Sequence, residues 1–135
     1  MTTDLLEKRG VMTTVRVELN PAQRASGEAV AALLAAMVGM LALAVVNQFT
    51  AASAAFNTWV HGVGKLWMPG AAGIGPYSGK ETIALLAWVG SWLVLHPAVR
   101  HRELTLSRWL IVFLIGVGVA TTLIWPPVFE YLAGH

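Results

Sequence analysis

The chain has 135 residues, of which 56% are apolar and 12% charged, with a mean hydropathy of +0.65. Charged residues make up about a quarter of an ordinary soluble domain, so this composition indicates that lipid is the main solvent. The chain has no cysteine, which excludes disulfides, thiolate metal sites and iron–sulfur clusters. The net charge of +2 comes from segments that flank apolar runs, which favours contact with anionic headgroups over nucleic-acid binding.

Residues 1–27 are polar and mixed in charge and are predicted to form a cytoplasmic arm, whereas 28–135 are predicted to form one transmembrane domain. The first apolar run, 29–49, carries no charge, and as a helix it would be about 31 Å long, enough to cross the hydrocarbon core. The small residues at 51–54 also resemble a signal-peptidase site. A run longer than the usual signal of about 7–15 apolar residues favours a retained helix.

A short amphipathic helix is predicted at 54–67, between the first and second spans, and is expected to lie in the membrane interface. Its apolar side chains recur at helical spacing, and we expect these to dock on a partner together with Tyr77. The helical docking residues are Phe56, Trp59, Val63 and Trp67. Packing of the same stripe onto the chain's own bundle is the alternative interpretation.

The sequence Ser78-Gly79-Lys80-Glu81 is predicted to form a capping box, in which Ser78 and Glu81 each bond the other's backbone N–H. A phosphate-binding loop is excluded. Ile74 stands where that motif needs its first glycine, and Glu81 stands where it needs Ser or Thr.

The second and third spans are predicted at 80–99 and 106–125. In the second, Trp92 and His96 are four residues apart and therefore share a face, and Pro97 is expected to kink or end the helix. In the third, Trp109 and Trp125 fall at the two boundaries, where indole rings anchor.

The distribution of basic residues predicts the orientation of the three helices. Seven of the nine Lys and Arg residues lie in the N-terminal arm or near the connection between the second and third spans. Cytoplasmic segments are enriched in these residues. The sequence therefore predicts an all-α membrane protein with its N-terminus inside and its C-terminus outside.

Small residues at four-residue spacing predict that the three helices pack closely. Such tracks occur in each span: Ala31, Ala35 and Gly39; Ala87 and Ser91, with Gly90 beside them; Gly116 and Ala120, followed by Gly118 and Thr122.

No ionisable residue lies in the middle of a span, which argues against a self-contained proton relay or intramembrane enzyme. Asn47 and Gln48, at the end of the first span, are expected to satisfy backbone groups or each other. His96 is the candidate ligand, because a neutral imidazole beside Trp92 could bind haem b or a chlorophyll magnesium. The alternative is that His96 simply marks the cytoplasmic boundary, next to Arg100 and Arg102.

In architecture the chain resembles small accessory subunits of respiratory or photosynthetic complexes. The three-span haem anchors of succinate dehydrogenase have a histidine signature that residues 96–101 do not match. We therefore predict a non-catalytic accessory or assembly subunit of a larger inner-membrane complex, such as a terminal oxidase, with no cofactor of its own. The alternatives are a haem-holding anchor that uses His96 and a holin-like homo-oligomer. No nucleotide or metal site is expected.

Overall fold

The computed structural model describes residues 26–68, 70 and 74–133, and within these residues it contains helices and no strand. Five α-helices follow one another along the chain: α3 (Ser26–Ala52), α4 (Ala54–Lys65), α5 (Tyr77–Val99), α6 (Leu106–Ile124) and α7 (Pro126–Ala133). The predicted all-α class is therefore confirmed for the described residues. The arm predicted at 1–27 lies almost entirely outside them.

Three of these helices, α3, α5 and α6, are long and apolar enough to cross a membrane. At 1.5 Å per residue they are about 40, 35 and 29 Å long, against about 30 Å for the hydrocarbon core. They coincide with the three predicted spans, although α3 extends past 29–49 at both ends and α5 begins at Tyr77 instead of residue 80. The chain is thus a multi-pass membrane protein.

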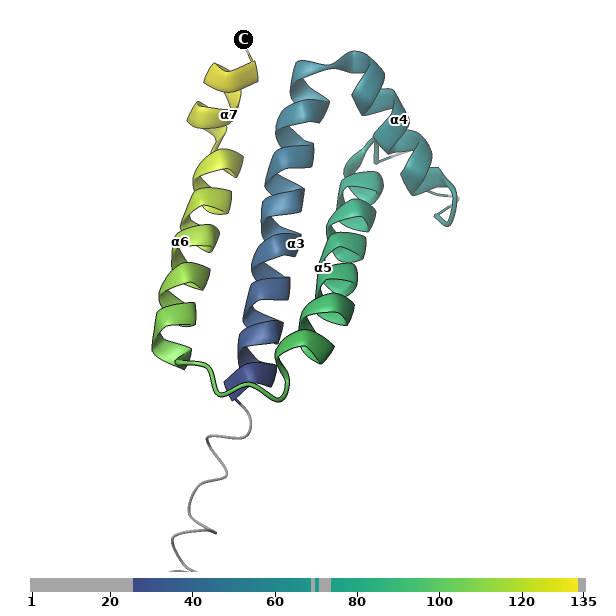
Figure 1. Ribbon diagram of the computed structural model, residues 1–135. Coiled ribbons are helices and arrows are strands. Elements are labelled where there is room, and N and C mark those ends of the chain that lie inside the picture. Colours follow the sequence, from purple (N-terminus) through teal and green to yellow (C-terminus); the bar gives the residue numbers. More distant parts are fainter. Residues whose placement is uncertain (1–25, 69, 71–73, 134–135) are drawn as a thin grey trace, which may run out of the picture.

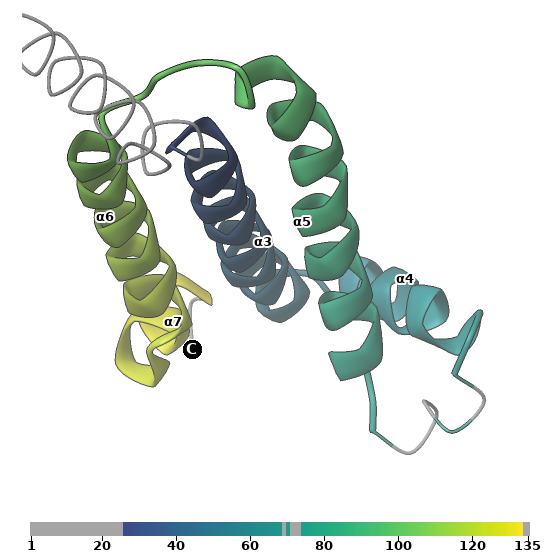
Figure 2. The ribbon, with the colours of Figure 1, turned by 90° about the horizontal axis from the view of Figure 1, so that it is seen from below.

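Helix α3 lies between α5 and α6, and the two views in Figures 1 and 2 agree on this arrangement. Burial follows from it, because α3 has neighbours on two sides. Val30, Ala31, Ala35 and Ala44 of α3 are fully buried. The apolar stretch of α5, in contrast, contains no buried residue, and large side chains such as Leu86 and Val94 are exposed on it. These faces are available to lipid.

Small residues explain how closely α5 and α6 approach α3. A Cβ added at Gly39 would lie 2.8 Å from the Cβ of Trp88, and one added at Gly116 would overlap the Met37 side chain. The predicted tracks of the first span and of Gly116–Ala120 are therefore confirmed as packing surfaces. In the second span Gly90 takes no part in packing, because a Cβ there would meet open space, and the same holds for Gly118 in the third span. Ala84 and Trp88 of α5 lie against Gly39, and Ala87 and Ser91 beside them are half-buried.

The bundle has two unlike ends. At one, here called the α4 end, α4 crosses beside the start of α5 and contacts α3, and α7 lies at the same end on the other side of α3 (Figure 1). At the other, here called the loop end, residues 100–105 connect α5 to α6. There the Leu104 N–H donates to the Ser26 hydroxyl at 3.2 Å, and a Cβ on Gly27 would overlap the Val99 carbonyl oxygen. The first turn of α3 thus packs against this connection.

Candidate functional site

The α4 end contains most of the residues predicted to dock on a partner. Helix α4 begins after Ser53, whose hydroxyl accepts from the Phe56 N–H at 3.3 Å, a standard N-cap. The Phe56 ring then contacts two other rings, with centroids 5.8 Å from Phe49 and 5.5 Å from Trp59. The aromatic side chains therefore form a row across the corner between α3 and α4.

Close backbone contact holds α4 against the first turn of α5. Val60 of α4 is fully buried, and a Cβ added at Gly79 would overlap its carbonyl oxygen. Likewise, a Cβ on Gly64 would overlap the Ser78 hydroxyl. Glycine at 64 and 79 is thus needed because the two backbones touch, and α4 is fixed to the bundle along part of its apolar face.

The predicted docking residues divide into two groups. Phe56 and Val63 are half-buried, so they are partly used within the chain. Trp59, Trp67 and Tyr77 are 57%, 60% and 64% exposed. These three, here called the aromatic set, leave apolar surface free at the α4 end. The Trp67 indole N–H donates to the Thr82 hydroxyl at 2.9 Å, which fixes its orientation relative to α5.

The predicted capping box is wrong. Helix α5 begins at Tyr77 and its N-cap residue is Pro76, which offers no side-chain cap. Ser78 consequently lies within the first turn, where it is 2% exposed and its hydroxyl has no hydrogen-bond partner. Proline is compatible with a helix start because it lacks an N–H that would remain unbonded there, and the helix that follows Pro76 includes Ser78 in its first turn.

Polar side chains tie α3 to both neighbours at the α4 end. The Lys80 ammonium donates to the Asn47 Oδ1 at 2.7 Å, and its nitrogen lies 5.4 Å from the centre of the Tyr77 ring. On the other side of α3, the Gln48 amide donates to the Leu123 carbonyl oxygen. Gln48 thus satisfies a backbone group, as predicted. The Asn47–Lys80 contact was missed, although a lysine in the first turn of an apolar helix is the signal that could have suggested it.

The second candidate site, His96 with Trp92, lies toward the loop end of α5. Their rings are 5.1 Å apart with an interplanar angle of 30°, so the two side chains stack along the helix as their spacing predicts. Helix α5 continues through Pro97 to Val99. Among the described residues no three His, Asp or Glu side chains are grouped so that they could hold a metal ion. A haem ligand at His96 stays a prediction.

The comparisons with known proteins found no match for this chain, whether among family models, curated proteins or solved structures.

Proposed function

We propose that this chain is a non-catalytic accessory or assembly subunit of a larger complex in the cell inner membrane, and that the aromatic set is where it contacts that complex. An energy-converting complex, such as a terminal oxidase, is the class that the three-span architecture favours. The observation that carries the proposal is the exposure of Trp59, Trp67 and Tyr77 on a rigidly seated α4 end.

Two members of the aromatic set lie outside the spans, where crossing the membrane does not require them, and the third, Tyr77, is the first residue of α5. Trp59 belongs to α4, and Trp67 follows that helix, so neither is part of a span. Leu66 beside them is 83% exposed. Tryptophan and tyrosine dominate the binding energy of protein interfaces when they enter a pocket of the partner. Because α4 is seated by backbone contacts at Val60 and Gly64, the exposed rings are pre-organised, which lowers the entropy cost of docking.

The distribution of charged groups supports a non-catalytic role. In α3, α5 and α6 the charged side chains and His96 lie within a few residues of a helix end: Glu28, Lys80, Glu81, His96 and Arg108. The middle of each described span is apolar or weakly polar. Ionisable groups at membrane depth are the usual mark of proton or ion chemistry, and these spans offer none.

The experiment is purification of the C-terminally tagged chain in mild detergent, with partners identified by mass spectrometry. We expect a stoichiometric larger partner with the wild type and little or none with Trp59→Ala/Trp67→Ala, since two interface tryptophans at about 2 kcal/mol each would weaken binding roughly a thousandfold. Trp125→Ala is the matched control, because Trp125 is 60% exposed like Trp67 but follows α6. Equal recovery of the partner with the double variant would contradict the proposal, as would a homo-oligomer without a partner.

The stacked Trp92–His96 pair supports a second candidate function, a haem-holding anchor in which His96 supplies one axial ligand and a partner the other. An absorption spectrum of the same sample tests it. This candidate predicts a Soret band that His96→Ala removes and His101→Ala preserves. A colourless, intact complex, or a band that survives His96→Ala, would rule out His96 as the haem ligand and leave the accessory role as the remaining candidate.

A further inference from the structure

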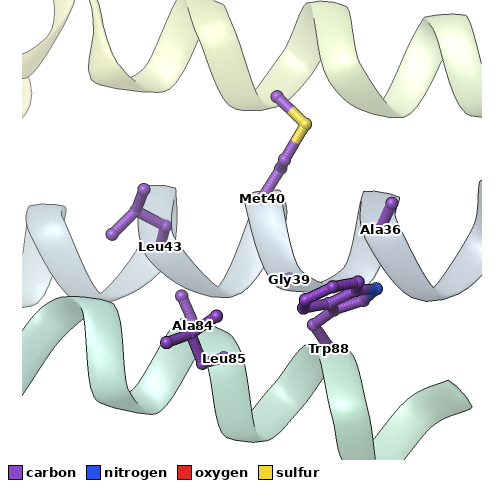
Figure 3. A pocket seen from close by; sticks show the side chains of 7 residues that line it. All are labelled: Ala36, Gly39, Met40, Leu43, Ala84, Leu85 and Trp88. Atoms are coloured by element: carbon purple, nitrogen blue, oxygen red, sulfur yellow. The ribbon is translucent and has the colours of Figure 1, made fainter.

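An apolar groove lies between α3 and α5 on one face of the bundle. It is shallow and open, with a volume of about 240 Å³, and its walls are apolar side chains and one glycine. Figure 3 shows the Trp88 indole lying against α3 beside Gly39, with Met40 extending away from α5. The remaining lining residues are Ala36, Leu43, Ala84 and Leu85. The groove exists because α3 carries small residues here while α5 carries a large ring, so the two helices touch at Gly39 and diverge beside it.

A second cavity, of about 200 Å³, extends this groove toward the α4 end. Leu43 lines both cavities, which makes them neighbours along α3. The second has a polar mouth formed by Asn47, Lys80 and Glu81, and Tyr77 and Ile124 complete its wall. Along α3 and α5 the lining of the two neighbouring cavities therefore changes from apolar, at Trp88, to charged, at Lys80 and Glu81.

The length of this surface matches one leaflet. From Lys80 at the mouth to Trp88 at the far end is eight residues of α5, which is about 12 Å of helix. Half of the hydrocarbon core is about 15 Å thick. A helix of a partner protein would need a groove through both leaflets, whereas the acyl chain of one lipid needs about the length that these two cavities span.

The charges at the mouth indicate which headgroup fits. One proton of the Lys80 ammonium is donated to Asn47 at 2.7 Å, and an ammonium has two more to offer a phosphate. Glu81, next to it on the same wall, brings a carboxylate that would accept from a cationic group. A lysine beside a glutamate is complementary to a phosphate beside an ammonium.

We propose that the groove between α3 and α5 binds one zwitterionic phospholipid with a primary amine, its phosphate on Lys80, its ammonium toward Glu81 and one acyl chain along Leu43 to Trp88. This site does not depend on the proposed function, because its test needs no partner protein.

The test is native mass spectrometry of the full chain, delipidated in mild detergent and then titrated with palmitoyl-oleoyl phosphatidylethanolamine. We expect one tightly bound lipid per chain, held at least tenfold more tightly than diacylglycerol, which has no phosphate. Lys80→Gln should weaken binding about tenfold, since a hydrogen bond to a charged group is worth about 1.5–3 kcal/mol. Glu81→Gln should remove the preference for this lipid over phosphatidylglycerol.

Two matched controls separate the site from general effects. Leu43→Trp fills the point that the two cavities share and should abolish tight binding, whereas Leu86→Trp, on an exposed part of α5 outside the groove, should not. Lys65→Gln, at the end of α4, should bind like the wild type. The proposal is overturned if Lys80→Gln binds as tightly as Lys65→Gln, or if phosphatidylglycerol binds as tightly as phosphatidylethanolamine. It is equally overturned if the groove is covered by a second copy, seen as a lipid-free dimer that Leu43→Trp dissociates.

Discussion

The two ends of the bundle are held together in different ways. At the α4 end, side chains of α3 reach both neighbours, as Asn47 accepts from Lys80 and Gln48 donates to the Leu123 carbonyl oxygen. At the loop end, the described contacts are made mainly with backbone: the Leu104 N–H on Ser26, and Gly27 against the Val99 and Arg102 carbonyl oxygens. Backbone fit thus serves both ends, at Gly64 and Gly79 as at Gly27, and the α4 end adds specific polar side chains that join α3 to its neighbours.

This difference suggests that the α4 end is the specialised one. The aromatic set, the polar mouth of the groove and the seated α4 all gather there. A connection that only joins two spans needs close packing against the neighbouring helix and no exposed binding surface. The loop end matches that description. The predictions below test the comparison, from the largest expected effect to the smallest.

The largest expected difference between the two ends is their side of the membrane. Basic residues cluster near the loop end, at Arg100, Arg102 and Arg108, so this end is expected in the cytoplasm. A reporter enzyme that is active only outside the cytoplasm should be active when fused after Gly75 or His135. A reporter that is active only in the cytoplasm should be active when fused after His101. A cytoplasmic Gly75 would reverse the orientation and place the aromatic set on the inner face.

The next effect should come from the glycines that fix backbone contacts. Gly79→Ala at the α4 end and Gly27→Ala at the loop end each place a Cβ on a carbonyl oxygen. Each should lower the free energy of unfolding by about 2–3 kcal/mol, because backbone must move to make room. Unfolding by SDS in mixed micelles measures this. Gly90→Ala is the control on α5, where a Cβ meets open space and the better helix propensity of alanine should leave the free energy of unfolding unchanged or slightly raised. A loss as large as that of Gly79→Ala would contradict the explanation by backbone contact.

The fold was largely predictable because the physics of a lipid solvent is simple. An uncharged run such as 29–49 must become a helix in order to satisfy its own backbone groups, so three apolar runs predict three helices. Helix packing was predictable only in part. Small residues show where close approach is allowed, but not which of them is used: Gly39 lies against Trp88, whereas a Cβ at Gly90 would meet open space.

The site was harder to predict because it depends on contacts between distant residues. The row of Phe56 and Trp59 could be read from helical spacing. The pairing of Lys80 with Asn47 could not, since it depends on how α5 is rotated and how far it slides along α3. The predicted cap at Ser78 failed for a local reason, because the helix begins two residues earlier, after Pro76, which places Ser78 inside the first turn.

A moderate effect is expected from the polar tie between α3 and α5. Lys80→Met keeps the length of the side chain and removes the charge, and Asn47→Ala removes the acceptor. A double-mutant cycle on the same unfolding transition should give a coupling of about 1 kcal/mol, the usual size for a polar contact in a membrane bundle. A coupling near zero would mean that the α4 end is held by packing alone, like the loop end. Lys65→Met supplies the baseline for removing a positive charge from this end.

The smallest effect is expected at the Trp67–Thr82 hydrogen bond, and it separates stability from orientation. The contact is exposed to solvent, so Thr82→Val should cost only about 0.5 kcal/mol in the free energy of unfolding. Its consequence for docking should be larger than that figure suggests, because the bond fixes the Trp67 ring relative to α5 and a free ring loses rotamer entropy when it binds. Recovery of the partner should therefore fall with Thr82→Val and remain unchanged with Thr121→Val, whose hydroxyl bonds a carbonyl within its own helix. If Thr82→Val leaves recovery intact while Trp67→Ala reduces it, the indole contributes as apolar surface and its fixed orientation plays no part.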